Sequence, residues 1–386
     1  MEFVSGGVCA PLGFTANAIS CGLRENSQRR DLALVVSELP AVASGVFSNA
    51  PQPGVCVRVS RENLQNHKAQ AILCNSGIEH SDITEDLEVA QALCGLVSKH
   101  TGINADHVVL SSVGMLGKDL DLKKVSASIS ALYAGRSRNG STAADAIITQ
   151  DTYKKEAALT FDVGGAKCTL GAMAKGCSMK NSDMANLLCF LTTDVAITHD
   201  LLDQAMNRAI TQGFNMLSVD RVACPNDMAV ILANGLAENT PITTEGPEYD
   251  LFVEALEKTV AQICRLIAGD GEGATKLLEC RITGAASQPE AARLAKAVAT
   301  NVPVRRMLFL GETDAAAVLT ALGPAATEAT VELHSNYGSV TVARMGWPVD
   351  FDPEIADMIF MGKEIDIIVT LPEGSESATA WGCDMP

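Results

Sequence analysis

Residues 175–194 read KGCSMKNSDMANLLCFLTTD, and this stretch decides how the rest of the chain is interpreted. It begins with Lys175 and contains a Met-Ala pair that is followed directly by Asn186. Three more side chains in it could act as nucleophiles: Cys177, Ser178 and Ser182. No histidine lies within the stretch to activate one of them. The segment therefore offers reactive groups without an evident general base.

The size and charge of the chain limit what it can do. With 386 residues and 47% hydrophobic content, it can bury a large core, and its length favours two domains or one domain with an appendage. The 29 basic and 46 acidic residues give a formal charge of −17. Such a charge repels phosphate backbones and anionic lipid surfaces, so we expect neither nucleic acid nor membrane as a partner.

The cellular setting is predicted from what the sequence lacks. The start, MEFVSGGVCAPLGF, shows no basic region followed by an apolar run, and no segment approaches the ~18 apolar residues of a membrane helix. We therefore expect a cytoplasmic protein whose 12 scattered cysteines are mostly small buried side chains. Without a CxxC pair or histidines at ligand spacing, neither a metal nor another cofactor is expected.

Short aliphatic runs that end at Gly, Pro or Asn predict buried strands. They cover residues 31–40, 69–77, 107–117 and 227–235. Between them, apolar residues recur at helical spacing. One such face includes Leu87, Ala90, Leu93 and Val97, and a longer amphipathic helix is predicted over 248–268.

After the glycine-rich GDGEGATK, residues 269–276, the pattern starts again. LECRITG, PEAARLAKAVAT, RRMLFLG and DAAAVLTALG predict strand, helix, strand and helix. ATVELH, SVTVAR and IDIIVTL then alternate apolar and polar residues, which is typical of half-exposed antiparallel strands. We expect a main body over residues 1–275 and a smaller C-terminal α/β domain over 276–386.

Motifs along nearly the whole chain resemble the ornithine acetyltransferase family. The resemblance rests on GGVCAPLGFTANAISCGL, DLALVVSELPAVASGVFSNA, SSVGMLG, AADAIITQDTYKK, GAMAKGCSM, MANLLCFLTTD, PNDMAVILANG, GDGEGATK and SATAWGCD, which occur in the family's order. It implies an α/β fold, a layered α/β/β/α sandwich. It also implies a homo-oligomer that acts on an amino acid or acyl-amino acid.

The same resemblance implies a reaction. Family members cleave themselves ahead of a threonine and transfer an acetyl group from N-acetylornithine to glutamate through an acyl-threonine. The freed α-amino group serves as the general base beside the hydroxyl. The position of that threonine is occupied here by Asn186, and the corresponding cleavage point is 185/186. A carboxamide nitrogen is a poor nucleophile and its oxygen has no proton to give up, so both reactions are expected to fail.

Other family positions are partly kept. At the oxyanion hole, Val113 replaces a threonine and loses its hydroxyl, whereas Gly114 keeps a backbone N–H. Thr149, Lys175 and Glu272 match the family's substrate-binding residues. The family's substrate-closing segment beyond the WxCD motif is expected to be missing, because this sequence ends at Pro386. Retained charges such as Lys175 could equally be structural.

Three hypotheses remain open from the sequence. The first is a family member repurposed as a non-catalytic or pathway-specific binding protein. The second is an acyltransferase or amidase of altered substrate or mechanism that uses the retained pocket. The third is cleavage after Asn186 by attack of its side chain on its own backbone carbonyl.

Overall fold

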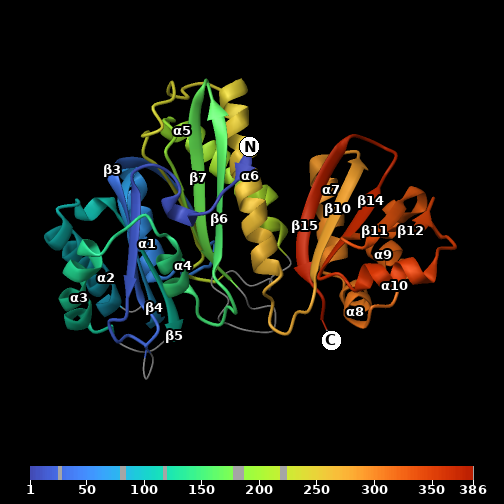
Figure 1. Cartoon of the computed structure of the whole chain (residues 1–386), viewed down its shortest axis with the longest axis horizontal. Coiled ribbons are helices and arrows are strands. Elements are labelled where there is room, and N and C mark those ends of the chain that lie inside the picture. The colour runs from blue at the N-terminus through green and yellow to red at the C-terminus, as the bar shows by residue number, and fades with distance from the viewer. Residues whose placement is uncertain (25–27, 79–83, 116–119, 177–186, 218–223, 386) are drawn as a thin grey trace. The chain divides into compact units, whose positions relative to one another are not determined.

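The computed structural model describes the chain except for residues 25–27, 79–83, 116–119, 177–186, 218–223 and 386 (Figure 1). The chain separates into two compact units. The first comprises Met1–Ala209 and Arg221–Ile263, and the second comprises Ile210–Asp220 and Cys264–Pro386. The domain boundary that the sequence predicts at residue 275 concerns which parts of the chain fold independently. It stays a prediction.

The first unit is built on a nine-stranded sheet in the order β1-β6-β7-β8-β9-β3-β4-β5, with β2 paired to β3. The strands are β1 Glu2–Phe3, β2 Phe14–Ile19, β3 Leu32–Phe47, β4 Lys68–Ile78, β5 Val108–Met115, β6 Lys155–Val163, β7 Ala166–Lys175, β8 Leu188–Thr193 and β9 Met228–Ala233. The long strand β3 pairs with β2 over Leu32–Ser37, with β4 between Leu32 and Val42, and with β9 over Val42–Phe47. It therefore belongs to both halves of a folded-over sheet.

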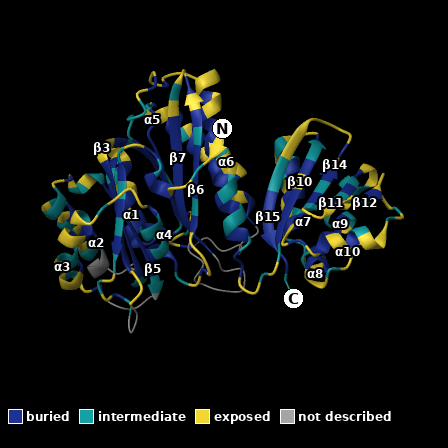
Figure 2. Ribbon diagram, viewed as in Figure 1, coloured by how far each residue is buried: buried dark blue, intermediate teal, exposed yellow. Residues whose placement is uncertain are grey.

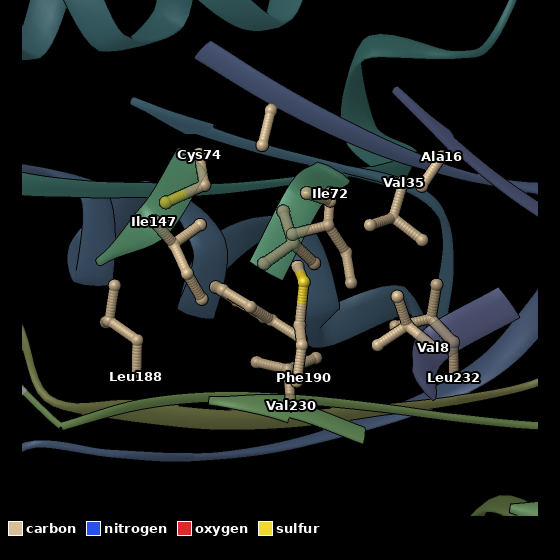
Figure 3. Close-up of a cluster of buried hydrophobic side chains, with 14 of the residues drawn as sticks. Val8, Ala16, Val35, Ile72, Cys74, Ile147, Leu188, Phe190, Val230 and Leu232 are labelled. Atoms are coloured by element: carbon tan, nitrogen blue, oxygen red, sulfur yellow. The ribbon is translucent and has the colours of Figure 1, made fainter. Parts of the chain in front are cut away.

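Apolar side chains fill the space between these two halves. Figure 3 shows Ile72 and Val35 of one half facing Phe190 and Val230 of the other. The short helix α4, Ser141–Ile147, contributes Ile147 to the same core. Removing these side chains from water supplies the main stabilisation of the unit.

Helices cover the outer face of each half. On one side, α1 Val55–Asn63, α2 Thr84–Thr101 and α3 Leu122–Ala134 pack on β3, β4 and β5 in a second buried cluster. On the other, α5 His199–Gln212 and α6 Pro247–Ala268 pack through contacts such as Phe161 with Phe252, whose ring centroids are 6.4 Å apart. Figure 2 shows these helices buried on one face and exposed on the other. The predicted α/β/β/α layering is confirmed.

The second unit contains a six-stranded sheet in the order β13-β12-β11-β14-β10-β15. Its strands are β10 Leu277–Ala285, β11 Thr330–Ser335, β12 Gly338–Arg344, β13 Trp347–Pro348, β14 Glu364–Thr370 and β15 Glu376–Cys383. Its helices are α7 Gln288–Ala299, α8 Val302–Leu310, α9 Ala315–Leu322 and α10 Pro353–Phe360. Only β10 and β14 run parallel, and the other neighbours are antiparallel. The unit is α/β, as the pattern predicts.

Five short 3₁₀ helices complete the described elements. They are η1 Gly7–Cys9, η2 Leu64–Asn66, η3 Ala105–His107, η4 Phe214–Met216 and η5 Gly323–Glu328. Within the described parts of the chain, no helix has the length and hydrophobicity that crossing a bilayer requires. The described cysteines are free thiols, and all but the partly buried Cys21 are buried, as expected.

The predicted strand RRMLFLG is wrong, because these residues belong to helix α8. The Asn301 side chain accepts a hydrogen bond from the Val304 N–H at 3.1 Å and so caps the start of the helix. Pro303 lies in the first turn, where a missing N–H costs nothing, and Gly311 ends the helix in a left-handed conformation. These capping residues outweigh the short aliphatic run.

Candidate functional site

Val113 and Gly114, the residues expected at the oxyanion hole, lie near the C-terminal end of β5. This strand runs parallel to β4, where Ser76 is opposite Val113 and Gly77 is opposite Gly114. Val113 is buried in the core between the sheet halves. Its side chain therefore contributes packing and offers no hydroxyl.

Gly114 has a backbone conformation that other residues rarely adopt, with φ of 143°. A Cβ atom at this position would lie 2.3 Å from the carbonyl carbon of Gly77 and 2.6 Å from its oxygen. The two glycines thus allow the strand ends to approach more closely than any side chain would permit. The position requires glycine on geometric grounds alone.

A guanidinium that the sequence reasoning missed ties this strand end to α4. Arg24 donates a hydrogen bond to the Ser76 hydroxyl at 2.8 Å and another to the carbonyl oxygen of Ile148. Ser76 in turn donates to the Ala146 carbonyl at 2.6 Å. Burial lowers the pKa of Arg24, with the nearby charge of Arg29 acting in the same direction. Because its nearest partners are carbonyls and a hydroxyl, Arg24 holds α4 and β4 together.

Thr149 follows directly after these contacts and is half-buried. Its backbone N–H donates to Asp151 Oδ2 at 3.1 Å. The other oxygen, Asp151 Oδ1, accepts from Lys155 Nζ at 2.7 Å and from the Gly176 N–H at 3.1 Å. One buried carboxylate thereby links Thr149 to the residue that follows Lys175.

The Asp151 carboxylate stays ionised despite its burial. Burial by itself would raise its pKa, but the positive charges of Lys155 and Lys175 and the hydrogen bonds from Lys155 and Gly176 outweigh that effect and lower it. The Asp151 and Lys155 side chains are both 0% exposed. The spacing Asp-x-x-x-Lys within ITQDTYKK was the only sequence signal for this pair.

Lys175 is the last residue of β7, which is paired with β6 on one side and β8 on the other. The residue is only 2% exposed. Its charge acts on Asp151 and on the thiol of Cys74. Burial nevertheless raises the pKa of Cys74 to about 12, so this thiol is neither an anion nor a nucleophile at neutral pH. Figure 3 shows it among the apolar side chains of the core.

Several of the predicted positions lie outside the described residues, namely Asn186, Cys177, Ser178 and Ser182. The residue next to Asn186 is described, and its position is fixed by Asp227. Asp227 Oδ1 accepts from the Leu187 N–H at 2.6 Å, and Oδ2 accepts from the Cys224 N–H at 3.1 Å. Asp227 therefore caps a turn and also anchors the start of β8.

Glu272 belongs to the second unit and is exposed in the loop between α6 and β10. The end of that loop is held by Asp384, whose Oδ1 accepts from the Thr275 N–H at 2.8 Å and the Lys276 N–H at 3.0 Å. The other expected residues that the structure describes, from Val113 and Gly114 to Thr149 and Lys175, are linked by contacts within the first unit. The roles of all these residues, Glu272 included, remain predictions.

No group of three or more metal-ligating side chains occurs in the part of the chain that the structure describes. The Arg24 guanidinium and the Ser76 hydroxyl donate to neighbouring protein groups, and the Lys175 side chain is buried beside them.

The sequence matches the profile of the ArgJ family over residues 15–386. It is 36% identical to the arginine biosynthesis bifunctional protein ArgJ of Symbiobacterium thermophilum, over 100% of this chain and 97% of the relative. The bifunctional protein ArgJ 1 of Clostridium acetobutylicum is 34% identical, with 96% and 93% covered. The Bacillus subtilis ArgJ protein is 32% identical, with 99% and 94% covered.

Two solved structures are also similar. The argJ protein of Bacillus halodurans gives a TM-score of 0.44 at 25% identity, with 48% of this chain and 97% of that chain covered. The ornithine acetyltransferase of Mycobacterium tuberculosis, complexed with ornithine, gives 0.43 at 26% identity, with 48% and 98% covered.

Proposed function

The chain belongs to the ArgJ family, and from that premise we propose that it retains a pocket for an amino acid or acyl-amino acid but has lost acetyl transfer through a threonine. We also propose that it does not cleave itself. The observation that carries the proposal is Asn186, which stands where the resemblance places the nucleophile. The protein then acts as a binding protein, either non-catalytic or specific to a pathway.

The chemistry of the side chain supports this loss. A threonine hydroxyl can transfer its proton to a base and attack a carbonyl, whereas the amide nitrogen of Asn186 is delocalised into its own carbonyl. Val113 also lacks the hydroxyl that would stabilise the oxyanion, a loss that typically costs about 10² to 10³ in rate. Both changes act against the same reaction.

Contacts within the first unit support the proposal that a pocket is retained. Thr149 and the Lys175–Gly176 segment are held by one carboxylate, that of Asp151. Lys175 presents a buried ammonium, which favours a ligand carboxylate or another anion. A pocket without use would not need this positive charge, since burying it is costly.

Intact mass spectrometry of the purified protein tests the proposal directly. We expect one uncut chain of 386 residues and no added acetyl group after incubation with N-acetylornithine. Calorimetric titration with N-acetylornithine and glutamate should still detect binding. Two fragments produced by cleavage between residues 185 and 186 would contradict the proposal, and so would a stable acetyl adduct. Cleavage after Asn186 would instead indicate succinimide chemistry.

Reversion variants give a sharper test. Asn186→Thr restores the hydroxyl, and we expect it to restore slow cleavage before residue 186. Adding Val113→Thr should accelerate this cleavage by about 10² to 10³, the effect of one oxyanion donor. Asn186→Ala is the matched control and should remain intact. If the double variant also stays uncut, the retained pocket is not the one we propose.

A second candidate is an acyltransferase or amidase of altered substrate or mechanism in the same pocket. The buried ammonium of Lys175 and the glycine at position 114 favour it, because both groups could orient and polarise an acyl donor. Acyl transfer abolished in a Lys175→Ala variant would support this candidate. Transfer that persists in this variant would exclude the site at Lys175.

A further inference from the structure

Among the residues that the structure describes, two buried lysines of the first unit lie near one buried carboxylate. Lys155 and Lys175 are positive, Asp151 is negative, and all three are almost completely removed from solvent. A buried charge is stable only when an opposite charge or strong hydrogen bonds compensate it. One negative charge cannot fully compensate two positive ones.

The geometry decides which lysine is compensated. Lys155 Nζ lies 2.7 Å from Asp151 Oδ1 and also donates to the Tyr153 carbonyl at 3.2 Å. Asp151 Oδ1 also accepts from the Gly176 N–H at 3.1 Å, and Oδ2 accepts from the Thr149 N–H at 3.1 Å. Asp151 is thus occupied by Lys155 and by the backbone.

Lys175 has no counter-ion among the residues that the structure describes. Among the residues that the structure describes, its ammonium forms no ion pair and donates no hydrogen bond, and it interacts with Asp151 only at longer range. The neighbouring thiol of Cys74 is protonated at neutral pH and offers no negative charge. The nearby guanidinium of Arg24 has the same sign as Lys175.

We propose that Asp151 and Lys155 are positioning residues: Lys155 neutralises Asp151, so that Asp151 fixes the backbone on both sides of the pocket while Lys175 keeps an uncompensated charge for an anionic ligand. This inference rests on the proposed function for the use of the pocket. The compensation of Asp151 by Lys155 exists without a ligand. Without Lys155, the carboxylate of Asp151 would pair with Lys175 and cancel the charge that attracts the anion.

A cycle of variants tests, in the ligand-free protein, whether Lys155 compensates the charge of Asp151. In the wild-type background, Lys175→Met removes an uncompensated buried charge, so the midpoint of urea unfolding should rise. In the Lys155→Met background, Lys175 is the partner of Asp151, so the same change should lower the midpoint. In a Lys155→Arg background, which keeps the positive charge, the midpoint should rise as in the wild type.

A reversal of sign between the wild-type and Lys155→Met backgrounds supports the inference. The same sign in both backgrounds overturns it, because Lys155 then does not control the environment of Lys175. If Lys155→Met does not fold, the cycle is run on Asp151→Asn, Lys155→Gln. There both charges of the pair are gone, and Lys175→Met should raise the midpoint again; a lowered midpoint overturns the inference.

Binding of small probes connects the charge to recognition. N-acetylglycine carries a carboxylate, and N-acetylglycinamide is its neutral counterpart. We expect the wild type to prefer the anion and Lys155→Met to lose about tenfold of that preference. Asp151→Asn, Lys155→Met should regain most of it, because its net charge is that of the wild type and the asparagine amide oxygen can still accept a hydrogen bond from a backbone N–H. A merely structural ion pair would not be rescued by the double change.

The outcomes separate the two proposals. A wild-type protein that binds neither N-acetylornithine nor glutamate contradicts the proposed function, while the sign reversal in unfolding is measured without either. A preference for the anion that is unchanged in Lys155→Met overturns the positioning roles, even if N-acetylornithine binds. A preference for the anion that is lost in Lys155→Met and regained in Asp151→Asn, Lys155→Met supports the positioning roles.

Discussion

At the scale of single residues, the candidate site depends on backbone geometry as much as on side chains. Gly114 lies against Gly77 at the paired ends of β5 and β4, where a Cβ atom would fall 2.3 Å from a backbone carbon. The neighbouring Val113 is packed in the core. The close approach of the two backbones therefore leaves no room for a side chain at position 114.

The first prediction concerns this close approach. Gly114→Ala should destabilise the protein by about 2–4 kcal/mol, because the change adds both a backbone strain and a steric clash. Gly164→Ala is the matched control: Gly164 has φ of 58° and no atom within 4 Å of the point where a Cβ would lie, so only about 1 kcal/mol is expected. Urea unfolding measures both, and equal losses would contradict the steric argument.

A second prediction concerns acid. The folded state lowers the pKa of Asp151 below its ordinary value of 3.8, so the unfolded chain binds this proton more readily. The stability from this group is present above that value and is lost as the pH falls through the lower folded-state pKa. In Asp151→Asn this acid-dependent loss should disappear, while Asp357→Asn, at an exposed helix position, should leave it unchanged. Urea midpoints measured down to about pH 3 compare them, and an unchanged acid slope in Asp151→Asn would contradict the prediction.

At the scale of elements, the residue after the C-terminal strand of the second unit binds the end of a loop that lies far from it in sequence. Asp384 follows β15 and accepts hydrogen bonds from the backbone of Thr275 and Lys276 and from the Thr275 hydroxyl. These contacts hold the end of the glycine-rich loop that carries Glu272. A buried carboxylate with three donors is a strong local restraint.

The third prediction follows from this restraint. Asp384→Asn should destabilise the second unit by about 1–3 kcal/mol, because the hydrogen bonds to a charged carboxylate become weaker neutral ones and the Thr275 hydroxyl has to turn from donor to acceptor. Hydrogen exchange at Thr275 and Lys276 should accelerate at least about tenfold. Asp350→Asn, an exposed residue of the same unit, is the control and should change neither quantity. Unchanged protection in Asp384→Asn would show that the loop is held by other contacts.

Helix α8 shows why some elements are harder to predict than others. Its residues 307–310, MLFL, form a short apolar run that suits a strand or a buried helix equally well. The outcome is set by Asn301, Pro303 and Gly311, which cap the helix at its two ends. Capping residues that flank a short apolar run are the signal that could have corrected the prediction.

At the scale of the whole molecule, exposed apolar side chains bear on the association of copies of this chain. The family resemblance implies a homo-oligomer, and the second unit exposes large apolar side chains, with Trp347 76% and Met361 71% exposed. Large exposed apolar groups of this kind are common where proteins associate. The formal charge of −17 opposes unspecific association, so any contact between copies should be specific.

The fourth prediction is that light scattering after size-exclusion chromatography gives a mass that is a multiple of the single chain. The variant Trp347→Gln should shift this equilibrium toward smaller species, because it removes exposed apolar area. A single-chain mass for the wild type at all concentrations would contradict the homo-oligomer.

The sequence by itself determined the family, the layered fold, most of the strands and helices, and the identity of Asn186, because these depend on motifs, on periodicity and on the chemistry of single residues. Only the tertiary structure decided that Asp151 is paired with Lys155 and that Lys175 is left without a described counter-ion. The same holds for Arg24 and for the contact of Gly77 with Gly114. Charge compensation and close backbone approach are properties of three-dimensional distance, which residue order does not specify.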